Sequence, residues 1–259
     1  MSQKYITEVS KYNKKDAVIA IWFYVIYFLA MIAAGFINRL YGLSMIGSWF
    51  NVAVGVACIG VVLIKKEKLS TIGFRNENLI KSLSLGLICG IISIVMLGIV
   101  PVLNGSEFSS FSTIANRFIY QLVFIVLTEE IFFRGYLQSR LYGLFRNDIS
   151  AILICGILFS LMHFPFMFIS NGGAGLISLN TFALFAFWFA MHIIINYVYK
   201  KSCVIYGVIV FHVVFNTAGG LFIEPNTLLF GIDFSYITNS ILPVIIAVIL
   251  LILGVRSVR

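Results

Sequence analysis

Charged residues are scarce in this chain of 259 residues: they make up 11% of it, while hydrophobic residues make up 61%. Soluble domains carry about 25% charged and about 45–50% apolar residues, so a water-soluble fold would lack the charge needed to cover its surface. The same composition excludes a disordered chain, a coiled coil and a secreted disulfide scaffold. The sequence therefore predicts an all-α polytopic membrane protein.

Cysteine is also rare, and several catalytic motifs are missing from the sequence. The four cysteines lie singly in apolar runs, without metal-ligand spacing, and we interpret them as small buried hydrophobes: Cys58, Cys89, Cys155 and Cys203. No His-Glu-x-x-His, Gly-x-Ser-Gly or Gly-x-Gly-Asp motif occurs, which argues against three other classes of intramembrane protease. No P-loop occurs either, so ATP-driven transport has no support.

Long apolar runs, in contrast, are abundant. A spanning helix needs about 20 mostly apolar residues to cross roughly 30 Å of hydrocarbon. Eight stretches meet this requirement: Ala17–Ile37, Met45–Ile64, Ser82–Leu103, Ile114–Phe133, Ile149–Ile169, Leu176–Tyr199, Cys203–Phe222 and Ile237–Val255. They predict a bundle of about eight transmembrane helices in a single membrane domain that comprises residues 1–259.

The basic residues predict how this bundle is oriented. Threading eight spans places sixteen of the 18 lysines and arginines on one side of the membrane or at its edge, and leaves only Arg39 and Arg117 opposite. By the positive-inside rule, both termini are expected in the cytoplasm, and the chain is expected in the cell membrane. The net charge of +8 is then a consequence of topology, and we expect no nucleic-acid partner.

One basic segment is too polar to span a membrane. Lys65–Lys81 lies between the second and third predicted spans and contains a few separated apolar residues. We expect it along the cytoplasmic interface, with Leu69, Ile72 and Phe74 directed into lipid. The loops expected on the opposite side are Asn104–Thr113, Ser170–Gly175 and Ile223–Tyr236.

Two carboxylates and three imidazoles remain unexplained by topology. Glu129 and Glu130 are the acidic residues inside an apolar run, and all three histidines, His163, His192 and His212, also fall inside predicted spans. A charge at membrane depth costs about 2.5 kcal/mol or more and is by default a functional hypothesis. Together these residues predict one polar site within the bundle.

Helix geometry gives the two glutamates different roles. Glu130 and Arg134 are four residues apart, share a helix face and can form an ion pair. Glu129 is rotated by about 100° from Glu130 and lacks this local cation. We expect Glu129 to be the reactive carboxylate and the Glu130–Arg134 pair to brace the helix. The alternative is that both glutamates serve only to hold helices together.

The histidines occur with a regular partner spacing. Phe159 lies four residues before His163, and Pro165, two residues after it, can open the helix there. His212 and Asn216 are four apart and share a face. His192 and Asn196 repeat the same spacing one span earlier. We prefer the His212 pair, and His192 is left as either a supporting or a packing residue.

These residues resemble a known set of motifs. Glu129-Glu130-x-x-x-Arg134, Phe159-x-x-x-His163 and His212-x-x-x-Asn216 look like the three motifs of the CAAX protease and bacteriocin-processing (CPBP, or Abi) family of intramembrane proteases. The motifs occur in the family's order, and the turns YVYKKS and STIGFR are similar too. The similarity covers about residues 69–217, and leaves 1–64 and 237–259 as peripheral helices.

The resemblance implies hydrolysis of a peptide bond in a membrane-associated or lipidated peptide or protein. Glu129 with His163 would activate water, while His212 and Asn216 would stabilise the oxyanion. Alternatively, a divalent metal, preferably zinc, would be bound by Glu129, His163 and His212 and would lower the pKa of its bound water to about 7. The two mechanisms use the same residues, and we slightly favour the metal-assisted one.

Two other functions compete with the protease. A non-catalytic membrane scaffold or bacteriocin self-immunity protein would bind a partner peptide or a sensor kinase without needing Glu129. A proton-coupled carrier would use the glutamates and histidines as a relay. The sequence shows no internal repeat of the kind that many carriers contain, which argues against the carrier.

Overall fold

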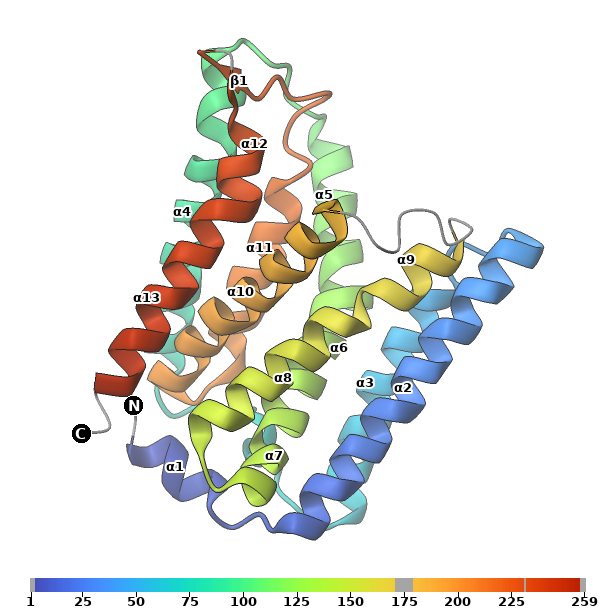
Figure 1. The fold of residues 1–259 in the computed structure, drawn as a ribbon, viewed down its shortest axis with the longest axis vertical. Helices are drawn as coiled ribbons and strands as arrows, with labels where there is room; N and C mark the ends of the chain where they lie inside the picture. Colours follow the sequence, from blue (N-terminus) through green and yellow to red (C-terminus); the bar gives the residue numbers. More distant parts are fainter. Residues whose placement is uncertain (1–2, 171–178, 231, 257–259) are drawn as a thin grey trace.

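The computed structural model describes residues 3–170, 179–230 and 232–256. They fold into a helical bundle with one short hairpin (Figure 1). The helices of the first part are α1 (Gln3–Val9), α2 (Lys14–Tyr41), α3 (Ile46–Ile64), η1 (Leu69–Ile72) and α4 (Leu79–Leu103). The central part comprises α5 (Phe111–Tyr120), η2 (Gln121–Val126), α6 (Leu127–Glu129), η3 (Glu130–Leu137) and α7 (Gln138–Phe145).

The remaining elements complete the bundle. They are α8 (Asp148–Met162), α9 (Phe164–Ser170), α10 (Leu179–Ser202), α11 (Ile205–Ala218), β1 (Leu228–Leu229), β2 (Ile232–Asp233), α12 (Phe234–Tyr236), η4 (Ile237–Ile241) and α13 (Leu242–Arg256). The strands β1 and β2 pair antiparallel. The predicted loop Ser170–Gly175 and the start of the stretch Leu176–Tyr199 lie largely outside the described residues.

The expectation of a membrane-spanning helical bundle is confirmed in its coarse form. Within the described residues, five helices are long and apolar enough to cross a membrane: Lys14–Tyr41, Ile46–Ile64, Leu79–Leu103, Phe111–Phe145 and Thr181–Ser202. The three other predicted stretches contain shorter apolar helices, Asp148–Met162, Ile205–Ala218 and Leu242–Leu253. The chain is therefore a multi-pass membrane protein, and the number of eight crossings stays a prediction.

Local sequence signals determine where several helices begin and end. Asn13 caps α2 through its side chain, and Asp16 returns a hydrogen bond to the backbone of Asn13, which forms a capping box. Gly42 ends the same helix in the left-handed region, at φ 69°, where glycine avoids the strain of a side chain. Pro165 cannot donate a backbone hydrogen bond, and α8 accordingly ends at Met162, so that His163 lies at the break before α9.

The long helical segment Phe111–Phe145 runs through the middle of the bundle (Figure 1). Its lower half, η3 and α7, is almost fully buried and contributes Phe132, Phe133 and Tyr136 to the core. These rings pack edge-on against tyrosine and phenylalanine side chains of α2. The segment is thus held in place by aromatic packing directly after the two glutamates.

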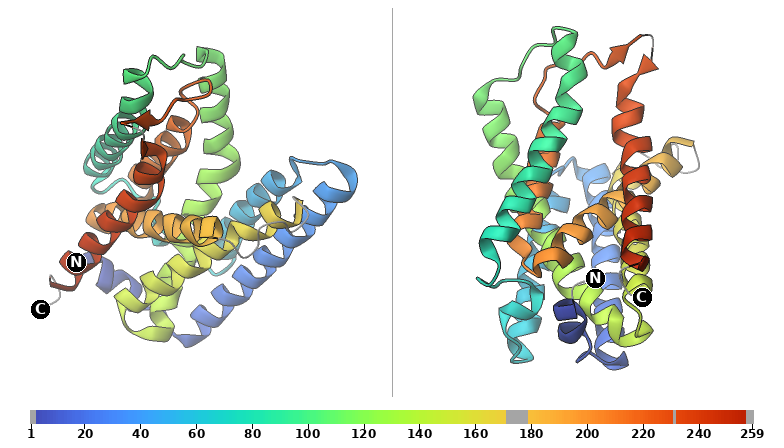
Figure 2. Two further views of the ribbon diagram at one scale, coloured as in Figure 1. Left: turned by 45° about the horizontal axis from the view of Figure 1, so that its top comes forward. Right: turned by 90° about the vertical axis from the view of Figure 1, so that its left-hand side faces the viewer.

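Helices α4 and α11 lie side by side at very short range (Figure 2). A Cβ atom placed on Gly86 would overlap the carbonyl of Gly207, and one placed on Gly207 would overlap the carbonyl of Ser82. Ser82 also bonds across the contact, since its hydroxyl donates to Val204 O at 3.1 Å and accepts from Gly207 N at 3.0 Å. Glycine at both positions therefore allows α11 to approach α4 closely.

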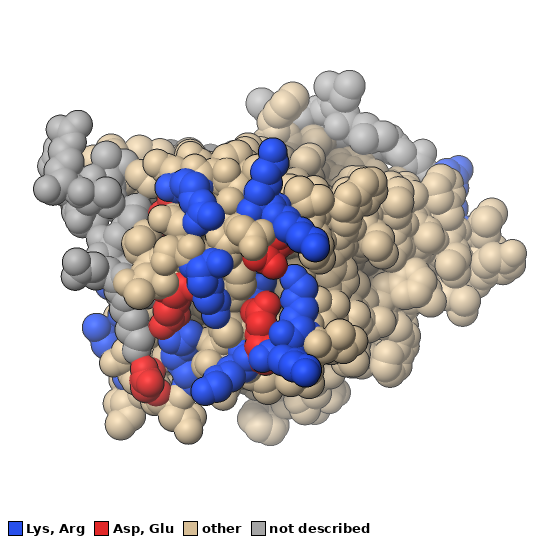
Figure 3. Space-filling view, turned by 90° about the horizontal axis from the view of Figure 1, so that it is seen from below, with Lys and Arg blue, Asp and Glu red and all other residues tan. Residues whose placement is uncertain are grey.

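Lysines and arginines gather at one end of the bundle, as Figure 3 shows from below. Acidic side chains are interspersed among them in ion pairs, which are Asp16–Lys65, Glu8–Arg75, Glu67–Arg140 and Asp148–Lys200. Burial raises the pKa of the Tyr12 hydroxyl, so it remains protonated and donates a hydrogen bond to Glu67 at 3.1 Å. We call this surface the basic end; its location in the cytoplasm stays a prediction.

The basic segment between α3 and α4 differs from its predicted position in one respect. Ile72 is not directed into lipid but is fully buried, and its carbonyl lies against Gly135, where a Cβ atom would come within 2.7 Å. Phe74 packs edge-on against Tyr206 of α11. Only Leu69 is exposed as expected. The difference arises because Gly135 leaves a depression on η3 that the turn fills, which the sequence of the segment alone does not indicate.

Candidate active site

The two glutamates lie at a change of helix type in the middle of the bundle. Glu129 is the last residue of α6, and Glu130 is the first of the π-helical turn η3. A second π-helical turn, η2, precedes α6. Such turns are rare and frequently occur at functional sites. Both carboxylates are buried; the side chain of Glu129 is 11% exposed and that of Glu130 is 0% exposed.

Glu130 forms the predicted ion pair with Arg134. The Nη1 atom of Arg134 lies 3.2 Å from Oε1 of Glu130, and both side chains are completely buried. The guanidinium also lies over the ring of Phe159, 4.3 Å from its centroid. Its nitrogen atoms make no hydrogen bond with the described residues, so the ion pair and the aromatic face together hold this cation.

His212 of α11 contacts both glutamates. Its Nδ1 atom lies 2.6 Å from Oε1 of Glu130, while its Nε2 atom lies 3.8 Å from Oε2 of Glu129. Because the Glu130 carboxylate accepts hydrogen bonds, we infer that Nδ1 carries the proton. In the neutral imidazole, Nε2 then presents its lone pair on the side of Glu129.

His163 lies near the other oxygen of Glu129 and has the same tautomer as His212. Its Nδ1 atom donates to the carbonyl of Phe159 at 2.9 Å, because a carbonyl oxygen can only accept. Its Nε2 atom lies 3.9 Å from Oε1 of Glu129. The ring is stacked on Trp188 of α10, with centroids 4.3 Å apart and planes at 17°. Backbone and indole together therefore fix the direction of this imidazole.

Asn216 and His192 lie apart from this group. Asn216 donates from its side-chain amide to Oε1 of Gln121 at 3.0 Å, one turn along α11 from His212. His192 is completely buried and packs on the ring of Phe159 at 5.6 Å between centroids. Asn196, the partner of His192 in the repeated spacing, instead exchanges amide hydrogen bonds with Gln138.

The donor atoms of this site can be compared with those that a bound metal ion requires. Two Nε2 atoms flank one carboxylate, and Oε2 of Glu129 is buried without a hydrogen-bond partner. Each histidine also donates its other nitrogen to a carboxylate or a carbonyl, as metal-bound histidines usually do. The donor types thus fit zinc. The Glu129 oxygens lie 3.9 and 3.8 Å from the two Nε2 atoms, farther than the about 3.4 Å expected between two ligands of one tetrahedral zinc ion. Among the described residues, no three metal-ligand side chains lie close enough together to hold an ion as they stand.

Two residues of the site were not predicted from the sequence. Trp188 orients His163, and Gln121 holds Asn216. A signal for Gln121 was present, since it is a polar residue in the same apolar run as Glu129. It is a weaker signal than the glutamates, because a neutral amide at membrane depth costs less than a charge. Trp188 carried no such signal, because an aromatic residue is ordinary in a membrane span.

Comparison with models of protein families finds one match within the chain. A family model described as type II CAAX prenyl endopeptidase Rce1-like matches residues 111–218. The match includes all six predicted catalytic residues: Glu129, Glu130, Arg134, His163, His212 and Asn216. No curated protein matches the chain. Residues 111–218 are therefore similar to the Rce1-like type II CAAX prenyl endopeptidase family, and this similarity suggests a protease.

Proposed function

We propose that this protein is an intramembrane endopeptidase, in which Glu129 activates water to hydrolyse a peptide bond of a membrane-associated or lipidated substrate. The observation that carries the proposal is the position of the Glu129 carboxylate between two imidazoles, 3.9 Å from Nε2 of His163 and 3.8 Å from Nε2 of His212. The family match implies a prenylated or peptide substrate, which agrees with a site between membrane helices.

The supporting contacts give each side chain a role. Glu129 takes a proton from a water molecule as the water oxygen bonds to the scissile carbonyl carbon. The second hydrogen of that water is donated to the lone pair at Nε2 of His163, which orients the water, and Nε2 of His212 lies on the other side of the carboxylate as the alternative acceptor. Glu130 keeps His212 in the required tautomer, and Arg134 supplies the charge opposite to Glu130.

The second half of the reaction returns the proton. The side-chain amide of Asn216 has two N–H groups, of which Gln121 takes one. We assign the other to the oxyanion that forms on the carbonyl oxygen, a contact typically worth about 10²–10³ in rate. As the C–N bond breaks, Glu129 gives its proton to the departing nitrogen, so that the products are one amine and one carboxylic acid, which then loses its proton to solvent.

A metal ion would strengthen the same arrangement. Glu129, His163 and His212 are the residues that would hold it, and it would supply Lewis acidity and a lower pKa for water. The family is generally considered metal-dependent. Metal analysis of the purified protein, with Glu129→Gln and His163→Ala as comparisons, tests this part separately: one bound ion that both changes remove supports it, while cleavage by metal-free protein contradicts it.

The hydrolysis itself is tested with Glu129→Gln, which keeps the shape of the side chain and removes the base. We expect cleavage of a prenylated peptide in proteoliposomes to fall by about 10²–10⁴-fold. The matched control is Glu107→Gln, an exposed glutamate in the loop after α4, which should cleave normally. Normal cleavage by a folded Glu129→Gln protein would contradict the proposal.

A further inference from the structure

The lysines of the basic end differ in what surrounds them. Lys65 pairs with one carboxylate oxygen of Asp16 at 3.1 Å, and the other oxygen accepts a hydrogen bond from the backbone of Asn13 at 3.1 Å. Lys15 and Lys66 are exposed and form no ion pair with a described residue. Because the acid beside them is already engaged, both of these positive charges are left uncompensated.

The Asp16–Lys65 pair also brings the two free lysines to the same place. It joins the first turn of α2 to the end of α3, and these two helices lie side by side (Figure 1). Lys15 is next to Asp16 in the sequence, and Lys66 is next to Lys65, so both cations flank one meeting point of the helices. We call these four residues the lysine junction.

The helix faces that lead to the lysine junction are apolar and exposed. Trp22 and Ile26 follow Lys15 by seven and eleven residues and therefore share its face of α2, where they are 63% and 62% exposed. Leu63 and Ile64, at the end of α3, are 55% and 82% exposed. Both helices are long and apolar enough to span a membrane, so these faces contact lipid. The lysines consequently lie where hydrocarbon gives way to headgroups.

The backbone at Lys66 has an unusual conformation for a lysine. Its φ of 56° lies in the left-handed region, which is favoured for glycine directly after a helix end. A side chain in this region adds strain that glycine avoids. The sequence thus has a cation at a position where the backbone alone would favour glycine.

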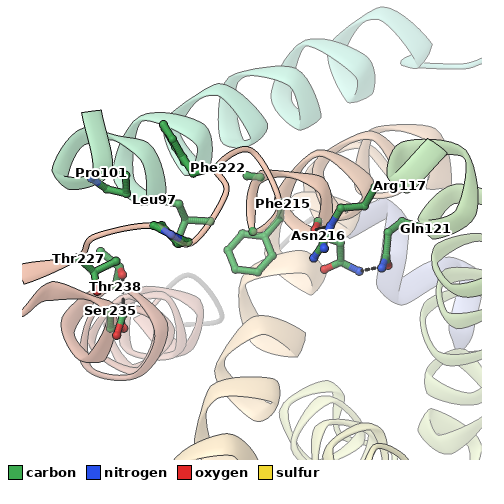
Figure 4. A pocket seen from close by; sticks show the side chains of 13 residues that line it. Leu97, Pro101, Arg117, Gln121, Phe215, Asn216, Phe222, Thr227, Ser235 and Thr238 are labelled. Atoms are coloured by element: carbon green, nitrogen blue, oxygen red, sulfur yellow. Dashed lines mark hydrogen bonds between the residues drawn. The ribbon is translucent and has the colours of Figure 1, made fainter. Parts of the chain in front are cut away.

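A cation at the opposite end of the bundle has different surroundings. Arg117 lines a cavity of about 410 Å³, and its Nε atom donates to the Asn216 carbonyl at 3.1 Å (Figure 4). The side-chain amide of Asn216 in turn donates to Gln121. Arg117 is therefore bound by the protein itself, in contrast to Lys15 and Lys66.

We propose that the lysine junction binds the phosphate of an anionic phospholipid, whose acyl chains lie along the exposed faces of α2 and α3. Lysine suits this position, because its apolar stem follows the hydrocarbon while its ammonium group reaches the headgroups. One lysine near a membrane surface strengthens the binding of anionic lipid by about fivefold. The proposal goes beyond peptide-bond hydrolysis and does not depend on it.

A second copy of the chain fits this surface less well than lipid does. In a dimer with a two-fold axis along the membrane normal, the same patch of both copies would meet. The lysines of one junction would then approach those of the other, and Asp16 is already paired with Lys65 in each copy. Anionic headgroups, in contrast, supply the charge that the junction lacks.

A purely local role for Lys66 makes a different prediction. A cation after the end of α3 interacts favourably with the helix dipole. This interaction would stabilise the protein equally in any lipid. The two explanations are therefore separated by comparing anionic with zwitterionic lipid.

The test uses the full chain in vesicles, with Trp22 as the reporter, because Trp22 lies about 10 Å along α2 from Lys15. The other two tryptophans, Trp49 and Trp188, are replaced by phenylalanine. Quenching of Trp22 fluorescence by brominated phosphatidylglycerol is compared with quenching by brominated phosphatidylcholine, which gives the relative affinity of the two lipids. We expect phosphatidylglycerol to bind about 5–25-fold more tightly, at about fivefold for each lysine.

Variants of the junction should remove this preference. Lys15→Gln/Lys66→Gln should bring the affinity ratio to about one. Lys66→Gly, which removes the charge and relieves the left-handed backbone, should lower the ratio by about fivefold. The control Lys11→Gln/Arg146→Gln removes two charges from the same end and should keep the ratio. In the unaltered protein, Lys11 lies over an aromatic ring and Arg146 donates to a backbone carbonyl.

The unfolding temperature provides a second measurement. A ligand that binds only the folded protein raises this temperature. Replacing phosphatidylcholine by phosphatidylglycerol should therefore raise it for the unaltered protein and the control, and leave it unchanged for Lys15→Gln/Lys66→Gln. If this variant unfolds at a lower temperature by the same amount in both lipids, the lysines act through the helix ends and the proposal is wrong.

The remaining outcomes also decide the question. Equal affinity of the unaltered protein for the two lipids would overturn the proposal. The same loss of preference in both double variants would indicate an effect of net charge in place of a local site, and would overturn it too. If inorganic phosphate removes the preference at constant ionic strength, the junction is a site for a free anion and not for lipid. None of these measurements requires cleavage of a peptide.

Discussion

Oε1 of Glu130 is contacted by two side chains from different helices, Arg134 at 3.2 Å and Nδ1 of His212 at 2.6 Å. It therefore links the charge balance of the buried site to the orientation of its histidine. Glu129, its neighbour in sequence, has no comparable partner on Oε2. Two adjacent glutamates thus differ in chemistry, because Oε1 of Glu130 contacts a guanidinium and an imidazole closely, whereas the Glu129 carboxylate lies 3.8–3.9 Å from the two imidazole nitrogens.

The buried ion pair predicts a large effect on stability. Arg134→Gln leaves the Glu130 carboxylate without its cation, and removal of one partner of a buried pair costs about 3–5 kcal/mol. We expect a clearly lower unfolding temperature in detergent. Arg146→Gln, which changes an exposed arginine 12 residues later, should unfold within a few degrees of the unaltered protein. Equal unfolding temperatures for the two variants would show that the pair contributes little.

At the scale of elements, the position of α11 depends on its contact with α4. This contact carries His212 to the glutamates, because α11 is held at the glycine positions 86 and 207 and by the hydrogen bonds of Ser82. Membrane helices generally associate through small residues, since lipid provides no hydrophobic drive between them. The distance between Glu129 and His212 is consequently set partly by backbone contacts at the basic side of α11.

Adding a methyl group to this contact should disturb both fold and activity. Gly86→Ala would overlap the Gly207 carbonyl, and overpacking of this kind typically costs about 1–3 kcal/mol. We expect a lower unfolding temperature and slower cleavage. Gly60→Ala is the matched control, because a Cβ atom there meets no other atom within 4 Å. Unchanged stability and activity of Gly86→Ala would contradict the role of the glycine contact.

Hydropathy predicted the existence of these elements better than their detailed form. Each of the eight apolar stretches contains a helix, because a backbone in lipid must satisfy its own hydrogen bonds. The π-helical turns around Glu129 were not predictable, since they depend on packing with neighbouring helices and not on the composition of the run. The break at His163 was predictable, because Pro165 lacks a backbone donor.

The candidate site was also predictable from the sequence only in part. The Glu130–Arg134 pair follows from the four-residue spacing of one helix. His212 contacts Glu130, which lies 82 positions earlier in the sequence. The sequence predicted only that the polar residues of the bundle share one site, not which of them are in contact. The stacking of Trp188 on His163 depends on how α8 and α10 cross. Contacts within one helix are thus accessible from spacing, while those between helices require the fold.

At the scale of the whole molecule, the basic residues are distributed unequally between the two ends of the bundle. The lysines and arginines of Figure 3 surround the turns that join α3 to α4, α7 to α8 and α10 to α11. The opposite end carries the cavity with Arg117. Because the positive-inside rule orients membrane proteins by such differences, we expect the basic end in the cytoplasm.

Labelling with a membrane-impermeant thiol reagent tests this orientation. In a background without the four native cysteines, Glu224→Cys at the cavity end should react in intact cells. Lys66→Cys, in the turn after α3 at the basic end, should react only after the membrane is permeabilised. The reverse pattern would invert the predicted topology.

The short length of α11 has a consequence for the chain that follows it. Its 14 residues rise about 21 Å, less than the roughly 30 Å of a hydrocarbon core, so a chain that starts at the basic end leaves the helix before it leaves the lipid. Irregular backbone at such depth must be shielded and hydrogen-bonded by the protein itself. The loop after α11 meets this demand by pairing with the loop after α4: Ser109 N donates to Leu221 O at 2.8 Å, and Ile223 N donates to Glu107 O at 2.8 Å. The two loops thus satisfy part of each other's backbone hydrogen bonding beyond the end of the helix.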